Sequence, residues 1–87
     1  MTLEEAASRL ESQFQVVSRT DFRGEVSLEL TLAQIESACR FAKEQLGFDF
    51  LADLSSVDNF GDEPRFEVVY ELYSLSSNIH LRLKTRV

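Results

Sequence analysis

Four side chains are the candidates for the chemistry of an enzyme or a metal site. They are the thiol of Cys39, the imidazole of His80 and the carboxylates of Asp53 and Asp58. A cysteine nucleophile needs a base beside it, and no helper histidine accompanies Cys39, so we expect a buried structural thiol. His80 is the only histidine, and the sequence has neither a second histidine nor a CxxC pair to complete a zinc or iron site. Neither residue predicts a reactive centre.

The two aspartates permit a different chemistry. A pair of carboxylates can act as general acid and base if the fold brings them together. The simpler interpretation is structural: Asp58 begins a turn, and Asp53 is a polar strand residue with a hydrogen-bond partner. The sequence also lacks a GxGxxG or GxxxxGK phosphate loop and a GxSxG nucleophile turn. We therefore favour a domain without a catalytic constellation, and we keep an enzyme using Asp53, Asp58 or His80 as an alternative.

The composition limits the class of protein. The chain has 87 residues and a formal net charge of -6, with 44% hydrophobic residues. An acidic surface repels nucleic-acid phosphates and anionic lipid headgroups, so we expect no nucleic-acid partner. The sequence contains no apolar run of 18 residues that would predict a membrane helix. Residues 1–14 lack the basic start of a signal peptide. With a single cysteine, these features favour a soluble cytoplasmic domain.

The first half of the chain predicts a helix followed by a hairpin. Thr2 and Glu5 have the spacing of a capping box, and apolar residues recur at helical intervals after them, so we expect a helix over Leu3–Gln13. We expect a hairpin over residues 15–30. Its strands are predicted at residues 15–19 and 25–30, with the turn at residues 20–24.

A second helix is predicted after this hairpin. Thr31 and Gln34 have the spacing of another capping box, and Gly47 is a candidate left-handed C-cap. One apolar stripe runs along the helix between them. Its members are Leu32, Ile35, Cys39, Ala42 and Leu46.

Three strands are predicted in the last part of the chain. Residues 48–57 are largely apolar on both faces, which is typical of a strand near the centre of a sheet or beneath a loop. Residues 65–73 and 79–84 alternate, with loops at residues 58–64 and 74–78. An acidic strand beside a basic one fixes the register, because a shift by one residue would place charges against apolar groups. The predicted pairs are Leu72 with Leu81, Tyr70 with Leu83, Glu71 with Arg82, Glu67 with Arg86 and Tyr73 with His80.

These elements predict an α+β two-layer sandwich in the order helix-strand-strand-helix-strand-strand-strand. Both apolar helix stripes need one face of a mixed five-stranded sheet, and a right-handed crossover connects the two halves. With strands numbered along the chain, we expect the order 1-2-5-4-3, with strands 2 and 5 parallel. Phe66 and Tyr70 should face the helices. The opposite face carries charges together with Val69 and Tyr73, so it is either solvated or docks a partner.

The last forty residues resemble a known family. Leu51, Asp53, Val57 and Asp58 match its L-x-D-x-x-x-V-D strand end, and a RFEVVY strand and a basic alternating strand follow. The chain thereby resembles the thirty-kilodalton subunit of respiratory complex I, known in bacteria as the C subunit of NADH-quinone oxidoreductase. Relatives occur in chloroplast NDH and in membrane-bound hydrogenases, and membership of complex I or of such a hydrogenase stays open. The first 47 residues agree in pattern only.

The resemblance implies a structural role. Members of that family hold no iron–sulfur cluster, flavin or quinone, so we expect no cofactor or metal in this domain. The resemblance implies docking in the peripheral arm against the forty-nine-kilodalton-type subunit and against neighbouring subunits. The forty-nine-kilodalton-type subunit, here the hydrogenase-like subunit, resembles a hydrogenase large subunit. Electron transfer from NADH to quinone would belong to the assembly, which would hold the domain at the cytoplasmic side of the inner membrane. We expect the partner interface at Asp58, Arg65, Val69, Tyr73, Arg82 and Lys84.

Two further expectations concern the extent of the domain and an alternative function. Residues 1–87 are predicted to form a single domain, the N-terminal domain of a longer subunit. The family's E-R-E-x-x-D motif, which follows this region, is absent from the sequence, so a shortened homologue is the other interpretation. A small-molecule-binding regulatory domain that acts as a dimer is the alternative function, because two-layer α+β folds often pair around metabolites.

Overall fold

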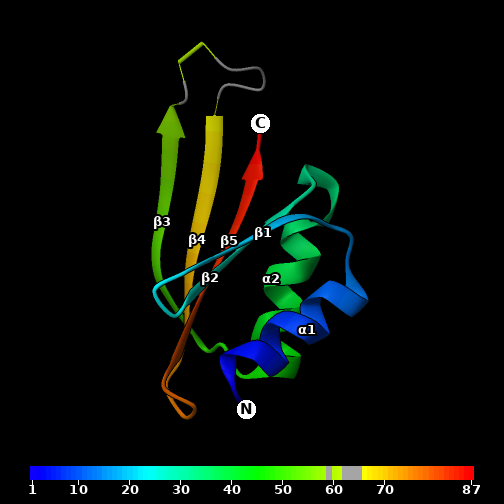
Figure 1. Ribbon diagram of the computed structural model, residues 1–87, viewed down its shortest axis with the longest axis vertical. Helices are drawn as coiled ribbons and strands as arrows, with labels where there is room; N and C mark the ends of the chain where they lie inside the picture. Colours follow the sequence, from blue (N-terminus) through cyan, green and yellow to red (C-terminus); the bar gives the residue numbers. More distant parts are fainter. Residues whose placement is uncertain (59, 62–65) are drawn as a thin grey trace.

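The computed structural model describes residues 1–58, 60–61 and 66–87, with the backbone alone at positions 50, 52 and 53. Two helices and five strands alternate along the chain (Figure 1). They are α1 (Leu3–Gln13), β1 (Val16–Phe22), β2 (Glu25–Leu30), α2 (Leu32–Leu46), β3 (Phe50–Asp58), β4 (Phe66–Ser74) and β5 (Ile79–Arg86). The predicted order of elements is confirmed.

The strands form one mixed sheet in the order β1-β2-β5-β4-β3. Strands β2 and β5 are parallel, and the other neighbours are antiparallel, so the predicted topology is confirmed. The register of the last hairpin is also confirmed, since Glu71 lies opposite Arg82 and Leu72 opposite Leu81. The remaining predicted pairs, Tyr70 with Leu83, Glu67 with Arg86 and Tyr73 with His80, are present as well.

The helix ends agree with the predictions at two of three caps. The hydroxyl of Thr2 accepts a hydrogen bond from the Glu5 amide, and the Glu5 carboxylate accepts one from the Thr2 amide. Gly47 ends α2 with φ of 77°, a conformation that glycine adopts without strain. The capping box predicted at Thr31 is wrong, because Thr31 makes no side-chain cap bond. The Gln34 side chain instead accepts a hydrogen bond from the Gln15 amide at 2.8 Å.

The first hairpin is tighter than predicted. Strand β1 continues to Phe22, so the turn consists of Arg23 and Gly24 alone instead of residues 20–24. Both turn residues have positive φ, 51° and 80°. Two-residue turns of this kind match the right-handed twist of the flanking strands, and this explains why the strand pairing extends to the turn.

The core lies between the two helices and the β2–β5 pair. Leu28, Leu81 and Leu83 are fully buried, and α1 and α2 contact β2 and β5. The α2 stripe is confirmed at Ile35, Ala42 and Leu46, which are buried. Leu32, in contrast, is 62% exposed, and Ala38 takes the central position. Ala38 and Ala42 are fully buried, so small side chains occupy the middle of the buried stripe of α2.

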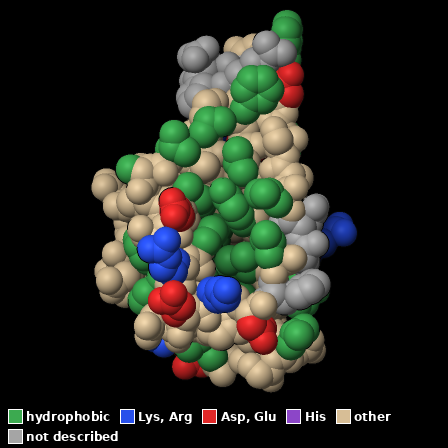
Figure 2. Space-filling model, turned by 180° about the vertical axis from the view of Figure 1, so that it is seen from behind, with side chains coloured by type: hydrophobic (Ala, Val, Ile, Leu, Met, Phe, Trp, Pro, Cys, Tyr) green, Lys and Arg blue, Asp and Glu red, His purple; other side chains and the backbone are tan. Residues whose placement is uncertain are grey.

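The helices leave half of one sheet face uncovered. In Figure 1 the ends of β3 and β4 extend past both helices. Strand β3 is an edge strand rather than the covered strand that its apolar run suggests, and Leu51 and Leu54 are 50% and 55% exposed. Tyr70 packs against the core, as predicted, and Phe66 lies on the same sheet face, but Phe66 is 41% exposed and outside the core cluster. Figure 2 shows hydrophobic side chains gathered on this side of the molecule.

Candidate functional site

The predicted interface residues on β4 and β5 lie on the sheet face that neither α1 nor α2 covers. Arg82 donates a hydrogen bond from Nε to Glu71 Oε1 at 2.5 Å. This bond raises the pKa of the Arg82 guanidinium above its ordinary value. His80 Nε2 contacts the other oxygen of Glu71, and the His80 ring stacks on Tyr73 with the ring centroids 4.8 Å apart. Glu71 is therefore held between two basic side chains.

Further ion pairs continue along this face. Lys84 Nζ lies 3.8 Å from Glu67 Oε2, and Arg86 Nε lies 3.4 Å from the same oxygen. Val69, on the same face, is only 7% exposed. Arg82, Lys84, Glu67 and Val69 line a hollow of about 480 Å³ that is bounded by residues of β1 and β3. The basic groups lining this hollow are thus already paired with acidic groups of the domain.

The structure places the six predicted interface residues at several sites. Tyr73 is 37% exposed and offers an aromatic ring to solvent, whereas Val69 forms part of the floor of the hollow. Asp58 ends β3 opposite Phe66, at the far end of the sheet from Tyr73. Arg65 lies outside the described residues. The interface itself stays a prediction.

A second hollow, of about 500 Å³, lies on the helical side of the sheet between α2 and the β3–β4 hairpin. Phe48 and Leu72 form a buried part of its lining, at 2% and 6% exposure, and Cys39 and Tyr70 contribute partly buried surface. Leu51 extends this apolar lining toward the sheet edge. Sequence reasoning missed this surface, although the two-sided apolar pattern of residues 48–57 was its signal.

The rim of the second hollow is charged on the α2 side. Arg40 Nη2 lies 3.1 Å from Glu36 Oε1, one helical turn away, and Lys43 and Glu44 follow. Figure 2 shows acidic and basic groups in a row along the hydrophobic patch. Asp49, which also lines this hollow, accepts a hydrogen bond from the Leu75 amide at 3.4 Å.

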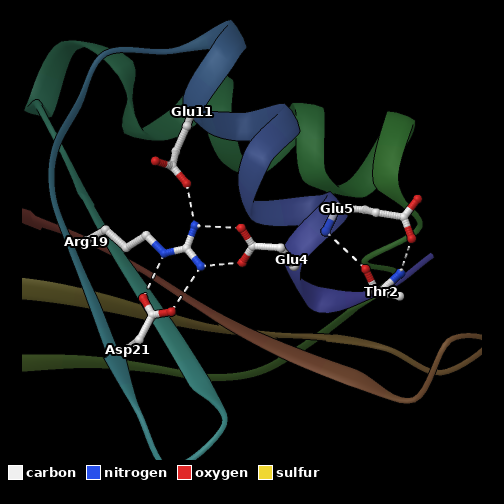
Figure 3. A network of polar contacts seen from close by, with 6 residues as sticks. All are labelled: Thr2, Glu4, Glu5, Glu11, Arg19 and Asp21. Atoms are coloured by element: carbon white, nitrogen blue, oxygen red, sulfur yellow. Dashed lines mark hydrogen bonds and ion pairs between the residues drawn. The ribbon is translucent and has the colours of Figure 1, made fainter.

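An arginine that the sequence analysis did not single out organises the other edge of the sheet. Arg19 on β1 donates hydrogen bonds to Glu11 at 2.7 Å, to Glu4 and to Asp21 (Figure 3). Hydrogen bonds to three carboxylates, that of Asp21 first, raise the Arg19 pKa, and the Arg19 bond lowers the pKa of Asp21. Because Glu4 and Glu11 belong to α1, this cluster attaches α1 to β1. Its role is structural.

Three of the four candidate chemical groups, those of Cys39, His80 and Asp58, are not brought together, and the side chain of Asp53 lies outside the described part of the chain. Cys39 packs against the core on the helical side, and burial raises the pKa of its thiol to about 11, so it is protonated at neutral pH. His80 lies on the opposite sheet face, and Asp58 at the far end of β3. Within the described residues, no group of three histidine, cysteine, aspartate or glutamate side chains has the geometry of a metal site. The described helices include none that is long and apolar enough to cross a bilayer.

Comparison with known proteins gives the family. The family model "Respiratory-chain NADH dehydrogenase, 30 Kd subunit" matches residues 28–87. The C subunit of NADH-quinone oxidoreductase from Geotalea uraniireducens is 37% identical over 84 residues, which are 94% of this chain and 51% of the relative. The C subunit from Geobacter sulfurreducens is 39% identical over 85 residues, with 94% and 52% coverage. The chain thus spans about half the length of these relatives.

A solved structure supports the fold independently. A chain in the structure of the membrane-bound sulfane sulfur reductase, an archaeal respiratory membrane complex, superposes with a TM-score of 0.78. It is 23% identical, and the match covers 95% of this chain and 48% of that one. The likeness at this identity concerns the fold. Together with the sequence matches over most of the chain, it leads to one conclusion: the chain belongs to the family of the thirty-kilodalton subunit of respiratory-chain NADH dehydrogenase.

Proposed function

We propose that this chain is a structural domain of the C subunit of an NADH-quinone oxidoreductase. The observation that carries the proposal is the match of residues 28–87 to the thirty-kilodalton subunit family, with 37% and 39% identity to two curated C subunits. The domain contributes surfaces rather than a reacting group. Oxidation of NADH and reduction of quinone belong to other parts of the assembly.

The proposed partner is the hydrogenase-like subunit of the forty-nine-kilodalton type, together with neighbouring subunits of the peripheral arm. Two features support a docking role. The uncovered half of the sheet exposes Leu51, Leu54 and Phe66, and contiguous apolar side chains on a soluble domain commonly mark a protein interface. On the other sheet face, Tyr73 is accessible beside the ion pairs of Arg82 and Lys84. The domain is held at the membrane through the complex, on its cytoplasmic side.

Affinity purification tests this proposal. The full-length protein, tagged and expressed from a plasmid in the source cells after deletion of the chromosomal gene, should co-purify with the hydrogenase-like subunit. Deletion should abolish NADH:quinone reductase activity in membranes, and the plasmid should restore it. The proteins recovered are identified by mass spectrometry. A tagged protein that purifies without any other part of the complex, from cells whose membranes keep full activity after the deletion, would refute the proposal.

A matched pair of variants separates docking from folding. Tyr73→Ala removes an accessible ring from the sheet, and Leu83→Ala removes a fully buried core side chain. If the predicted interface is used, Tyr73→Ala should lower the amount of hydrogenase-like subunit recovered while the variant itself accumulates normally. Leu83→Ala should lower the amount of the variant itself. Equal recovery of the partner with Tyr73→Ala and with the unchanged chain would exclude this residue from the interface.

A further inference from the structure

We propose that the uncovered half of the sheet, on its helical side, binds an amphipathic α-helix of another subunit, with lysine or arginine on the edge of that helix that lies above β3. The inference rests on the proposed function for its setting, an assembly of several subunits, and names the kind of partner element. The helix would lie beside α2 and complete the helical layer. The docking surface consists of Phe48, Leu51, Leu54, Phe66, Tyr70 and Leu72.

The first argument is the incomplete layer. A two-layer α+β domain buries one face of its sheet beneath helices, but α1 and α2 pack mainly on β2 and β5. The positions over β4 and β3 are left open on the same side (Figures 1 and 2). Packed helices lie roughly 8–10 Å apart, so the next helix beside α2 would lie over the hairpin. The hollow of about 500 Å³ between α2 and β3 is the beginning of that groove.

The second argument is the gradient of exposure across the surface. Leu72, on β4 and opposite Leu81 of the covered strand β5, is 6% exposed. Leu51, its partner on the next strand outward, is 50% exposed, and Leu54 opposite Tyr70 is 55% exposed. The apolar pattern thus continues one strand beyond the helices that cover it. Because these leucines point from the face of the sheet, a partner that covers them must lie across the face, as a helix does, and a strand added at the edge would leave them exposed.

The third argument is charge. No lysine or arginine occurs from residue 45 to residue 58, whereas Asp49 lines the hollow and Asp58, opposite Phe66, lies on the same sheet face as Leu54. On the other side of the groove, Glu36 and Arg40 form an ion pair, so α2 has both signs of charge. A helix that lies beside α2 therefore meets acidic groups without basic ones only near the two ends of β3, at Asp49 and Asp58, and basic side chains on that edge are favoured. A second copy of this chain, with a net charge of -6 and the same acidic border, does not fit.

Photocrosslinking in the assembled complex identifies the partner element. Leu54 is replaced by benzoylphenylalanine in the tagged full-length protein, and crosslinked peptides are sequenced after illumination. The expected product joins position 54 to a peptide of another subunit with apolar residues at helical spacing and lysine or arginine on one flank. Three outcomes would overturn the inference. They are a crosslink to a second copy of this chain, a crosslink to a segment with the alternating pattern of a strand, and no crosslink at all.

Variants measure what the surface contributes. Leu54→Lys should reduce the recovery of the partner found by crosslinking by about tenfold, since it places a charge in an apolar contact. Leu54→Ala should have a smaller effect. The matched control is Val17→Lys, at a residue that is 56% exposed on the opposite edge strand, and it should leave recovery unchanged. The thermal unfolding of all three variants is recorded in parallel.

The outcomes distinguish this inference from the proposed function. If Leu54→Lys recovers the complex as well as the unchanged chain does, the helix site is wrong and the proposed function stands. If the unchanged chain recovers no other part of the complex, the proposed function itself is wrong, and with it the inference. If Leu54→Lys and Val17→Lys reduce recovery equally, the effect is not local to this surface, and the inference is likewise refuted.

Discussion

The two halves of the sheet contain similar leucine side chains, but these are buried in one half and exposed on the edge strand of the other. In the β2–β5 half, Leu28, Leu81 and Leu83 have no exposed surface, because both helices pack on them. In the β3–β4 half, Leu51 and Leu54 are half exposed, although β3 pairs with β4 along its whole length. Strand pairing alone therefore does not bury a side chain. The β2–β5 half supplies most of the strand residues of the buried core, whereas the β3–β4 half exposes apolar side chains to solvent.

The sequences of the two halves reflect this difference. Strand β5 alternates strictly, with Leu81 and Leu83 toward the helices and Arg82 and Lys84 toward solvent. Strand β3 places Leu54 on one face and Val57 on the other, and both are accessible at 55% and 42%. A bulge between Leu51 and Asp53 shifts its register once. An edge strand that is apolar on both faces and bears no lysine invites contact with other chains.

The largest predicted effect tests the covered half. Leu83→Ala should lower the free energy of unfolding by about 2–5 kcal/mol, because it deletes a fully buried side chain and leaves a cavity. Leu54→Ala, which makes the same chemical change in the uncovered half, should cost less than about 0.5 kcal/mol. Urea titration of the two variants gives both values. Equal losses would show that the two halves do not differ in the way described.

A smaller effect is expected at the attachment of α1 to β1. Arg19→Met removes the shared partner of Glu4, Glu11 and Asp21 and should lower the free energy of unfolding by about 1 kcal/mol, as is typical of exposed ion-pair networks. Salt at about 1 M should shrink this difference, since it screens exposed charges. Arg40→Met, which breaks the single ion pair with Glu36, is the control and should change stability less. An Arg19→Met loss that is independent of salt would point to packing as its cause.

The smallest effect is a dependence on pH. The hydrogen bond from Arg19 lowers the pKa of Asp21 in the folded state from its value of 3.8 in the unfolded chain. A lowered pKa means that the folded state binds the proton less readily, so this interaction stabilises the protein above pH 3.8 and is lost as the pH falls through the lower folded value. The stability difference between Arg19→Met and the unchanged chain should therefore narrow below that pH. Thermal unfolding between about pH 3 and pH 7 measures it, and a constant difference would contradict this explanation.

The sequence predicts the strand register best where a slip of one residue would be energetically unfavourable. The pairing of Glu71 with Arg82 and of Tyr70 with Leu83 was predictable, because a slip of one residue would bury charge and expose leucine. The Thr2 cap was predictable from local spacing alone. The position of β3 at the sheet edge followed from the predicted order of strands.

Other features depend on contacts that spacing does not contain. Thr31 has the pattern of a cap, but Gln34 bonds to the Gln15 amide, nineteen residues away. The Arg19 cluster likewise joins residues that lie far apart in the sequence. The exposure of Phe66 depends on where the helical layer ends, which no strand pattern encodes. The site on the uncovered half had a signal in the two-sided apolar pattern of residues 48–57, but that pattern does not say how far the helices cover the sheet.

The parallel pairing of β2 with β5 has a consequence for the integrity of the domain. Among the described strands, β5 alone joins two hairpin ribbons that share no other hydrogen-bonded neighbour, β1–β2 on one side and β3–β4 on the other. Damage to this one strand would divide the sheet into two ribbons, neither of which contains enough apolar surface to persist alone. Because β5 follows the other described elements of the domain, a ribosome must release residues 79–86 before the two ribbons can join.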